Sequence, residues 1–189
     1  GTESIFARDD ALKIDPYNEA TGITEDDIPE VLLPRVKTAR EGVELLGHIV
    51  ETIGAGEGFG VVLMDEKEVW YFETGTGHQW LAQKTPKDKY FASGNQGRLQ
   101  QYDPKSPDFL ASKTLVEWAT KNGFYDPRKD GEFNFSKAYT RDDARDRDYN
   151  DPRVWQVQKI LTPSLNQKVT DGRSFPVWAT PDSKVTVED

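Results

Sequence analysis

The chain has 189 residues, a formal net charge of −9 at pH 7 and no cysteine. The negative charge argues against nucleic acid and anionic membrane as partners, because both bind basic surfaces. The lack of cysteine excludes disulfides, thiolate metal sites and an internal cysteine nucleophile, and His48 and His78 are too few for a multi-histidine metal centre. We therefore expect no metal and no cofactor, and a cytoplasmic location fits although composition alone leaves the compartment open.

The core that these residues can build looks incomplete. Only 35% of them are hydrophobic, against roughly 45–50% in a typical domain on a definition that also counts glycine. Five Trp, seven Tyr and nine Phe compensate in part, because each ring buries a large area. We expect residues 1–189 to form a single incomplete domain, the middle part of a larger protein whose missing N- and C-terminal parts complete the core. If those parts are absent, we expect an apolar sheet face or helix flank either to lie open to solvent or to be covered by a second copy of the chain.

The clearest predicted helix in the first third of the chain covers residues 38–53. Thr38 and Glu41 match a capping box, and Gly54 can take the left-handed conformation that ends a helix. Before it, residues 8–27 are expected to form a loop, followed by a short helix that ends at Leu33. Apolar residues at a spacing of four predict the helix face that packs on a sheet, namely Leu45, Ile49 and Ile53.

A period of two then marks a strand-rich region, residues 58–95. The predicted strands cover residues 59–64, 69–74, 79–84 and 90–93. Short polar connectors join them, which is typical of an antiparallel meander.

The later part, residues 106–162, is helix-rich. Helices are predicted for residues 112–121 and 152–161, the second with Pro152 in its first turn. Residues 133–139 fit either a short strand or a helix. Eight charged residues of both signs between 140 and 151 indicate a solvated segment with many ion pairs.

Two positions are candidates for chemistry. Asn95 follows the last predicted strand, where a rigid mount could aim its amide at a developing oxyanion, although an ordinary Asn turn is the more common interpretation. Arg153 lies in the first turn of a helix, where the helix dipole gives a cation no help, so it either pairs with a carboxylate or holds an anionic group. Glu57 and Glu73 are possible general bases, but isolated acids there are more often solvated or bonded to a backbone amide.

Five ordered segments of the chain carry a resemblance to a known family, the C69 dipeptidases of the dipeptidase A type. Each segment alone is weak, and their common order is the stronger signal. They are AREGVELLG at 39–47, VWYFE at 69–73, TGHQW at 76–80, GNQ at 94–96 and YNDPRVW at 149–155.

The resemblance implies an α+β fold, an αββα sandwich of the N-terminal nucleophile hydrolase type with an antiparallel sheet and packed helices, here incomplete. It also implies a cysteine nucleophile, exposed as the first residue, that precedes everything in this chain. By the same resemblance, Asn95 is the asparagine on the oxyanion side and Arg153 secures the site. The stretch Thr2, Glu3 and Ser4 lines the site for a dipeptide substrate.

The expected function is therefore that of a section of a cysteine-type dipeptidase, inactive by itself because the nucleophile is absent. One alternative keeps the fold and changes the substrate to that of the penicillin or bile-salt amidases. A second alternative is a non-catalytic binding module that presents Trp70, Tyr71 and Trp80 to a sugar. Exposure separates them, because a sugar platform needs rings that face solvent.

Overall fold

Five strands pair antiparallel in the order β1-β2-β3-β4-β6 in the computed structural model, which describes residues 1–186. Strands β5 and β7 pair in a separate two-stranded sheet. The fold is thus a mixture of helices and antiparallel sheet. The strands are β1 (Thr2–Ser4), β2 (Phe59–Met64), β3 (Val69–Thr74), β4 (Trp80–Lys84), β5 (Tyr90–Phe91), β6 (Phe109–Ala111) and β7 (Trp178–Ala179).

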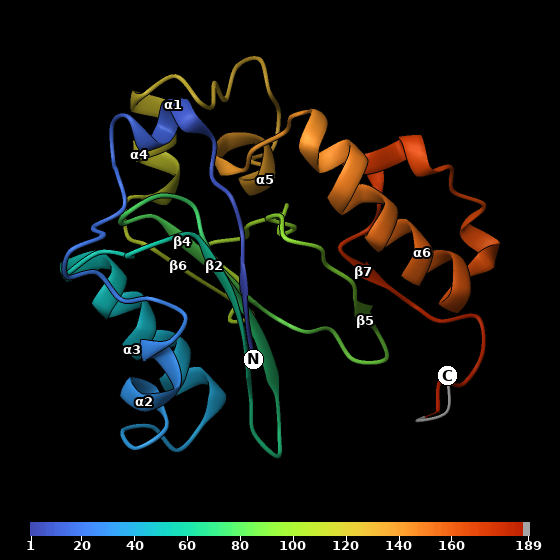
Figure 1. Ribbon diagram of the computed structural model, residues 1–189, viewed down its shortest axis with the longest axis horizontal. Coiled ribbons are helices and arrows are strands. Elements are labelled where there is room, and N and C mark those ends of the chain that lie inside the picture. The colour runs from blue at the N-terminus through green and yellow to red at the C-terminus, as the bar shows by residue number, and fades with distance from the viewer. Residues whose placement is uncertain (187–189) are drawn as a thin grey trace.

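Helices cover the flanks of these sheets (Figure 1). A one-turn π-helix, η1, leads directly into the longest helix of the second half, α6. The helical elements are α1 (Asp9–Leu12), α2 (Asp27–Leu32), α3 (Ala39–Thr52), α4 (Leu115–Lys121), α5 (Phe135–Tyr139), η1 (Asp146–Asn150), α6 (Asp151–Leu161), η2 (Pro163–Leu165) and η3 (Val169–Ser174).

The elements stack in layers, because alternate strand residues face opposite sides of the large sheet. One side buries Phe72 and its neighbours against α2 and α3. On the other side the Tyr71 ring lies 4.2 Å from that of Phe91 in β5, which lies 5.2 Å from that of Trp178 in β7. Helix α6 then covers the small sheet through Val154. The order from one flank to the other in Figure 1 is helix, large sheet, small sheet, helix.

Helix α3 confirms the predicted helix and corrects its predicted face. Thr38 Oγ1 accepts a hydrogen bond from Glu41 N, and Gly54 has φ +106°, as the capping signals predict. The predicted apolar face is right only in part: Leu45 and Ile49 pack half-buried against the core, but Ile53 is 48% exposed. Gly42 and Gly47 let the sheet approach α3 on a neighbouring face of the helix. A Cβ on Gly47 would clash with the ring of Trp80. The buried residues are Ala39, Gly42, Val43, Leu46, Gly47 and Val50.

The predicted four-stranded meander holds for its first three strands and is wrong for the fourth. Strands β2, β3 and β4 are adjacent and antiparallel. The residues predicted as the fourth strand pair with β7 instead, and β6 takes the place beside β4. The physical reason is packing: the ring of Phe91 lies between those of Tyr71 and Trp178, on the face of the large sheet and not at its edge.

Two further segments differ from expectation, and one open alternative is decided. The predicted loop at residues 8–27 contains the short helix α1. Of the two alternatives for residues 133–139 the structure has the helix, α5, with Asn134 Oδ1 accepting from Lys137 N at 3.0 Å. The charged segment 140–151 is rich in ion pairs but is not solvated throughout, since Asp146 is only 2% exposed. Burial there is possible because each buried polar group has a partner.

Candidate functional site

Three distant parts of the chain meet at Asn95. Its Nδ2 donates to the backbone oxygen of Ser4 at 3.0 Å, across 91 positions of sequence. Its Oδ1 accepts from Arg153 Nη1 at 2.6 Å, across 58 positions. The fold therefore brings together Asn95, Arg153 and strand β1, all three of which the sequence analysis predicts at the site.

The side-chain amide of Asn95 has one N–H donor that no residue of the described chain accepts. A primary amide has two N–H donors, and within residues 1–186 only the bond to Ser4 uses one of them. The charge-assisted bond from Arg153 to Oδ1 fixes which end of the amide faces the guanidinium. The remaining N–H is thus held in a defined direction on a half-exposed side chain.

Asn150 is a site residue that sequence reasoning missed. Its Oδ1 accepts from Asn95 N at 2.9 Å, and its Nδ2 donates to Asn95 O at 3.0 Å. The single side chain therefore clamps both backbone groups of Asn95. Gly94 is required beside it, because a Cβ there would lie 2.9 Å from Asn150 Oδ1.

The π-helix η1 holds this clamp in place. Asn150 Nδ2 also donates to Asp146 Oδ1 at 2.7 Å, and Arg141 binds both oxygens of Asp146 at 3.0 and 3.1 Å. Asn150 is 1% exposed, so this polar chain lies inside the fold. Single π-helical turns are rare and are frequent at functional sites. The only sequence signal for it was the dense charge of residues 140–151.

No carboxylate of the described residues forms an ion pair with Arg153. Within the described chain no Asp or Glu oxygen lies within 4.0 Å of its guanidinium, whose carbon instead sits 5.0 Å from the ring centroid of Tyr149. Among residues 1–186 Arg153 therefore forms no ion pair, although its charge lowers the pKa of Glu3. An exposed guanidinium fixed by an amide and an aromatic ring is free to hold an anionic group.

Strand β1 presents its residues to both faces of the large sheet. Glu3 pairs with Gly60 and faces the small sheet, where its Oε1 accepts from the Tyr71 hydroxyl at 2.5 Å. Burial raises the pKa of Glu3, opposed by hydrogen bonding from Tyr71 and by the charge of Arg153. The Thr2 side chain lies on the opposite face, and Ser4 Oγ donates to Glu25 at 2.6 Å.

The two other candidate acids are bonded to backbone amides, as the sequence favoured. Glu73 is fully buried and accepts from Arg98 N at 2.5 Å and Leu99 N at 2.9 Å. Burial raises the pKa of Glu73 to about 7 despite those bonds. Glu57 accepts from Glu25 N at 3.0 Å. Both acids hold loops in place.

The aromatic platform is contradicted by burial. Trp70, Tyr71 and Trp80 are 0%, 2% and 5% exposed. A sugar cannot stack on rings that the core already covers.

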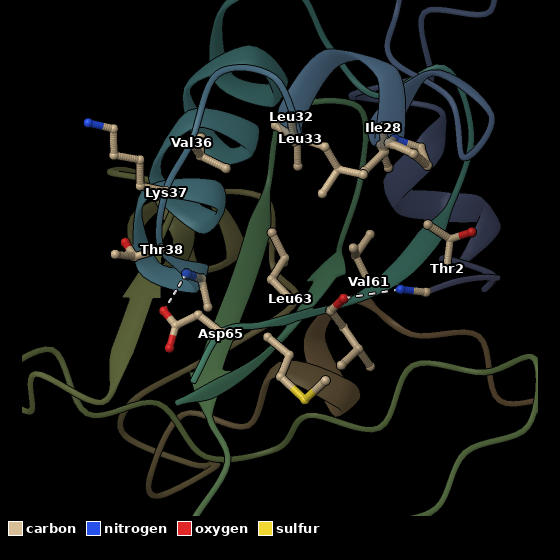
Figure 2. Close-up of a pocket in the computed structure, with 15 residues that line it drawn as sticks. Thr2, Ile28, Leu32, Leu33, Val36, Lys37, Thr38, Val61, Leu63 and Asp65 are labelled. Carbon is tan, nitrogen blue, oxygen red and sulfur yellow. Dashed lines mark hydrogen bonds between the residues drawn. The ribbon is translucent and has the colours of Figure 1, made fainter. Parts of the chain in front are cut away.

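An apolar groove lies on the far side of the sheet from Asn95. Figure 2 shows it between α2, the start of α3 and strand β2, with Leu32, Val61 and Leu63 lining it and Thr2 at its rim. Its volume is about 470 Å³. The groove shares β1 with the Asn95 cluster but none of the other candidate residues.

Within residues 1–186 no three acidic or histidine side chains form a group that could hold a metal, and no helix is long and apolar enough to cross a membrane.

Comparison with known proteins identifies the family. The model of peptidase family C69 matches residues 1–189. The chain belongs to peptidase family C69. A probable dipeptidase of Salmonella dublin is 52% identical to this C69 chain over 187 residues, and a probable dipeptidase of Latilactobacillus sakei is 38% identical over 189. A dipeptidase of Bifidobacterium longum (strain NCC 2705) is 32% identical over 214 residues.

These relatives are longer than the chain. The matches cover 98%, 100% and 100% of this chain but 43%, 39% and 40% of the three relatives. The C69 chain thus spans about two fifths of their length. The predicted resemblance to the family is confirmed.

Proposed function

We propose that this C69 chain is a section of a cysteine-type dipeptidase and carries the oxyanion side of its active site. The observation that carries the proposal is the convergence of Asn95, Arg153 and β1, held by Asn150. Relatives that match across the chain are named dipeptidases or probable dipeptidases, which supports a dipeptide as substrate.

In the proposed reaction a thiolate from outside these 189 residues attacks the peptide carbonyl. Negative charge then develops on the carbonyl oxygen, and the free N–H of Asn95 Nδ2 donates to it. Such a donor acts because it is fixed in place before charge develops. Arg153 holds Oδ1 of the same amide and keeps Nδ2 turned toward the reacting centre.

The proposed architecture is the αββα sandwich of the N-terminal nucleophile hydrolases. The layer order of helix, large sheet, small sheet and helix supports it, although β5 and β7 supply only the short start of a second sheet. The Asn95 cluster joins β1 of the large sheet to α6, the helix that covers the small sheet. Remaining strands of the second sheet are proposed to come from other parts of the longer protein, without which this chain is inactive.

The test compares substrates in the protein expressed at the length of its relatives. We expect turnover of Ala-Ala and none of penicillin V or glycocholate. Cleavage of either amide in preference to the dipeptide would replace the proposed function by that of an amidase. The cytoplasmic location and the self-association of the chain stay predictions. Self-association is favoured by two apolar residues of the groove that are largely exposed, Leu33 at 75% and Met64 at 74%.

A further inference from the structure

Glu3 is a carboxylate at the candidate site, and the charge of Arg153 lowers its pKa without direct contact. Glu3 is half-buried, its Oε1 accepts from the Tyr71 hydroxyl at 2.5 Å, and hydrogen bonding by the Ser93 side chain also lowers its pKa. In the part of the chain that the structure describes, no Lys or Arg nitrogen lies within 4.0 Å of it. A partly buried carboxylate without an ion pair is costly, so it is a good binding site for a cationic ligand.

Glu3 lies on β1, the strand that Asn95 contacts. Glu3 is adjacent in β1 to Ser4, whose backbone oxygen lies 3.0 Å from Asn95 Nδ2. Neighbouring residues of a strand are about 3.3 Å apart along its axis. In a dipeptide the α-ammonium is separated from the scissile carbonyl carbon by a single carbon atom. A carbonyl held at Asn95 therefore brings the ammonium of the same residue close to β1.

The surroundings of Glu3 favour an ammonium over other ligands. Tyr71 donates to one carboxylate oxygen, and the charge of Arg153 favours the charged form of Glu3 without forming an ion pair with it, so a negative group is left for a small cation. The pKa of Glu3 is raised by burial, and a bound ammonium would reverse that effect by favouring the charged form.

We propose that the Glu3 carboxylate binds the α-ammonium of the substrate and restricts the site to peptides with a free amino terminus. The inference rests on the proposed dipeptidase function and goes beyond it by assigning the substrate class to one residue. Tyr71 is the positioning residue that holds the carboxylate.

The test measures KM and kcat for Ala-Ala and for N-acetyl-Ala-Ala in the protein at the length of its relatives. Glu3→Gln keeps the acceptor for Tyr71 and removes only the charge. We expect KM for Ala-Ala to rise about 10- to 100-fold, the usual range for a charge-assisted bond, with kcat little changed. We expect N-acetyl-Ala-Ala to be a poor substrate of the wild type and to be unaffected by the substitution, so the preference for the free dipeptide falls by the same factor.

Two further variants make the result specific. Glu3→Asp retains the charge and should recover part of the preference. Glu66→Gln changes an exposed glutamate in the β2–β3 turn and should leave both substrates unchanged. Thermal unfolding of each variant shows whether the fold is intact.

The outcomes separate this inference from the function beneath it. An unchanged KM for Ala-Ala in Glu3→Gln, or an equal loss on both substrates, would overturn the role of Glu3 and leave the dipeptidase proposal standing. A wild type that hydrolyses neither peptide would overturn the proposed function and the inference with it.

Discussion

Replacing Asn150 by alanine removes the clamp on Asn95 without touching the side chain proposed to act. Four hydrogen bonds are lost: two to the backbone of Asn95 at 2.9 and 3.0 Å, one to Asp146 at 2.7 Å, and a long one from Arg153 Nη1 at 3.5 Å. A net contribution of about 1 kcal/mol for each of the three short bonds in this buried position gives a loss of about 3 kcal/mol. For a chain of this size that lowers Tm by about 6–12 °C.

The assay is thermal unfolding of this chain, combined with amide hydrogen exchange. The Asn95 N–H should exchange faster in Asn150→Ala, while the buried Val50 amide in α3 should keep its relative protection. Asn122→Ala is the matched control, because Asn122 Nδ2 makes one local bond, to Trp118 O at 2.9 Å. It should cost about 1 kcal/mol or less. A shift in Tm for Asn150→Ala no larger than for Asn122→Ala would refute the clamp.

Three other predictions follow from the same structure. In the protein at the length of its relatives, Asn95→Ala should lower kcat for Ala-Ala by ~10²–10³ with little change in KM, because one oxyanion donor is lost; a rise in KM alone would contradict this. Arg153→Lys should lower kcat by about 10-fold or more, because an ammonium cannot bind Asn95 and cover the Tyr149 ring together; near-normal kinetics would count against it. The folded pKa of Glu73, about 7, lies above its ordinary 4.5. Between these two pKa values the folded state holds a proton that the unfolded state has lost, so the free energy of unfolding should fall by about 1–3 kcal/mol from pH 5 to 8. Urea titrations at each pH measure this fall, and Glu73→Gln should reduce it.

The fold was predictable where local signals dominate. Capping by Thr38 and the turn at Gly54 place α3 correctly, and the period of two places β2, β3 and β4. The face of α3 was only partly predictable from spacing, since Gly47 matters only because Trp80 of a distant strand packs on it. The partner of β5 was missed for a similar reason, because a strand of two residues is decided by the rings on either side of it.

The site was predictable only in part. Asn95 and Arg153 were candidates from their placement, the family resemblance assigned their roles, and the contact between them needs the fold. Asn150 carried no periodic or compositional signal that separates it from its charged neighbours. Its role depends on the π-helical turn, which directs its amide at a loop 55 positions earlier in the chain.

The most direct test of the proposed function is dipeptide hydrolysis before and after thiol alkylation. The protein at the length of its relatives should hydrolyse Ala-Ala and lose that activity with iodoacetamide. The 189-residue chain has no cysteine, so it should show only background turnover in the same assay. Turnover by the purified 189-residue chain, or activity of the longer protein that survives complete alkylation, would contradict the account.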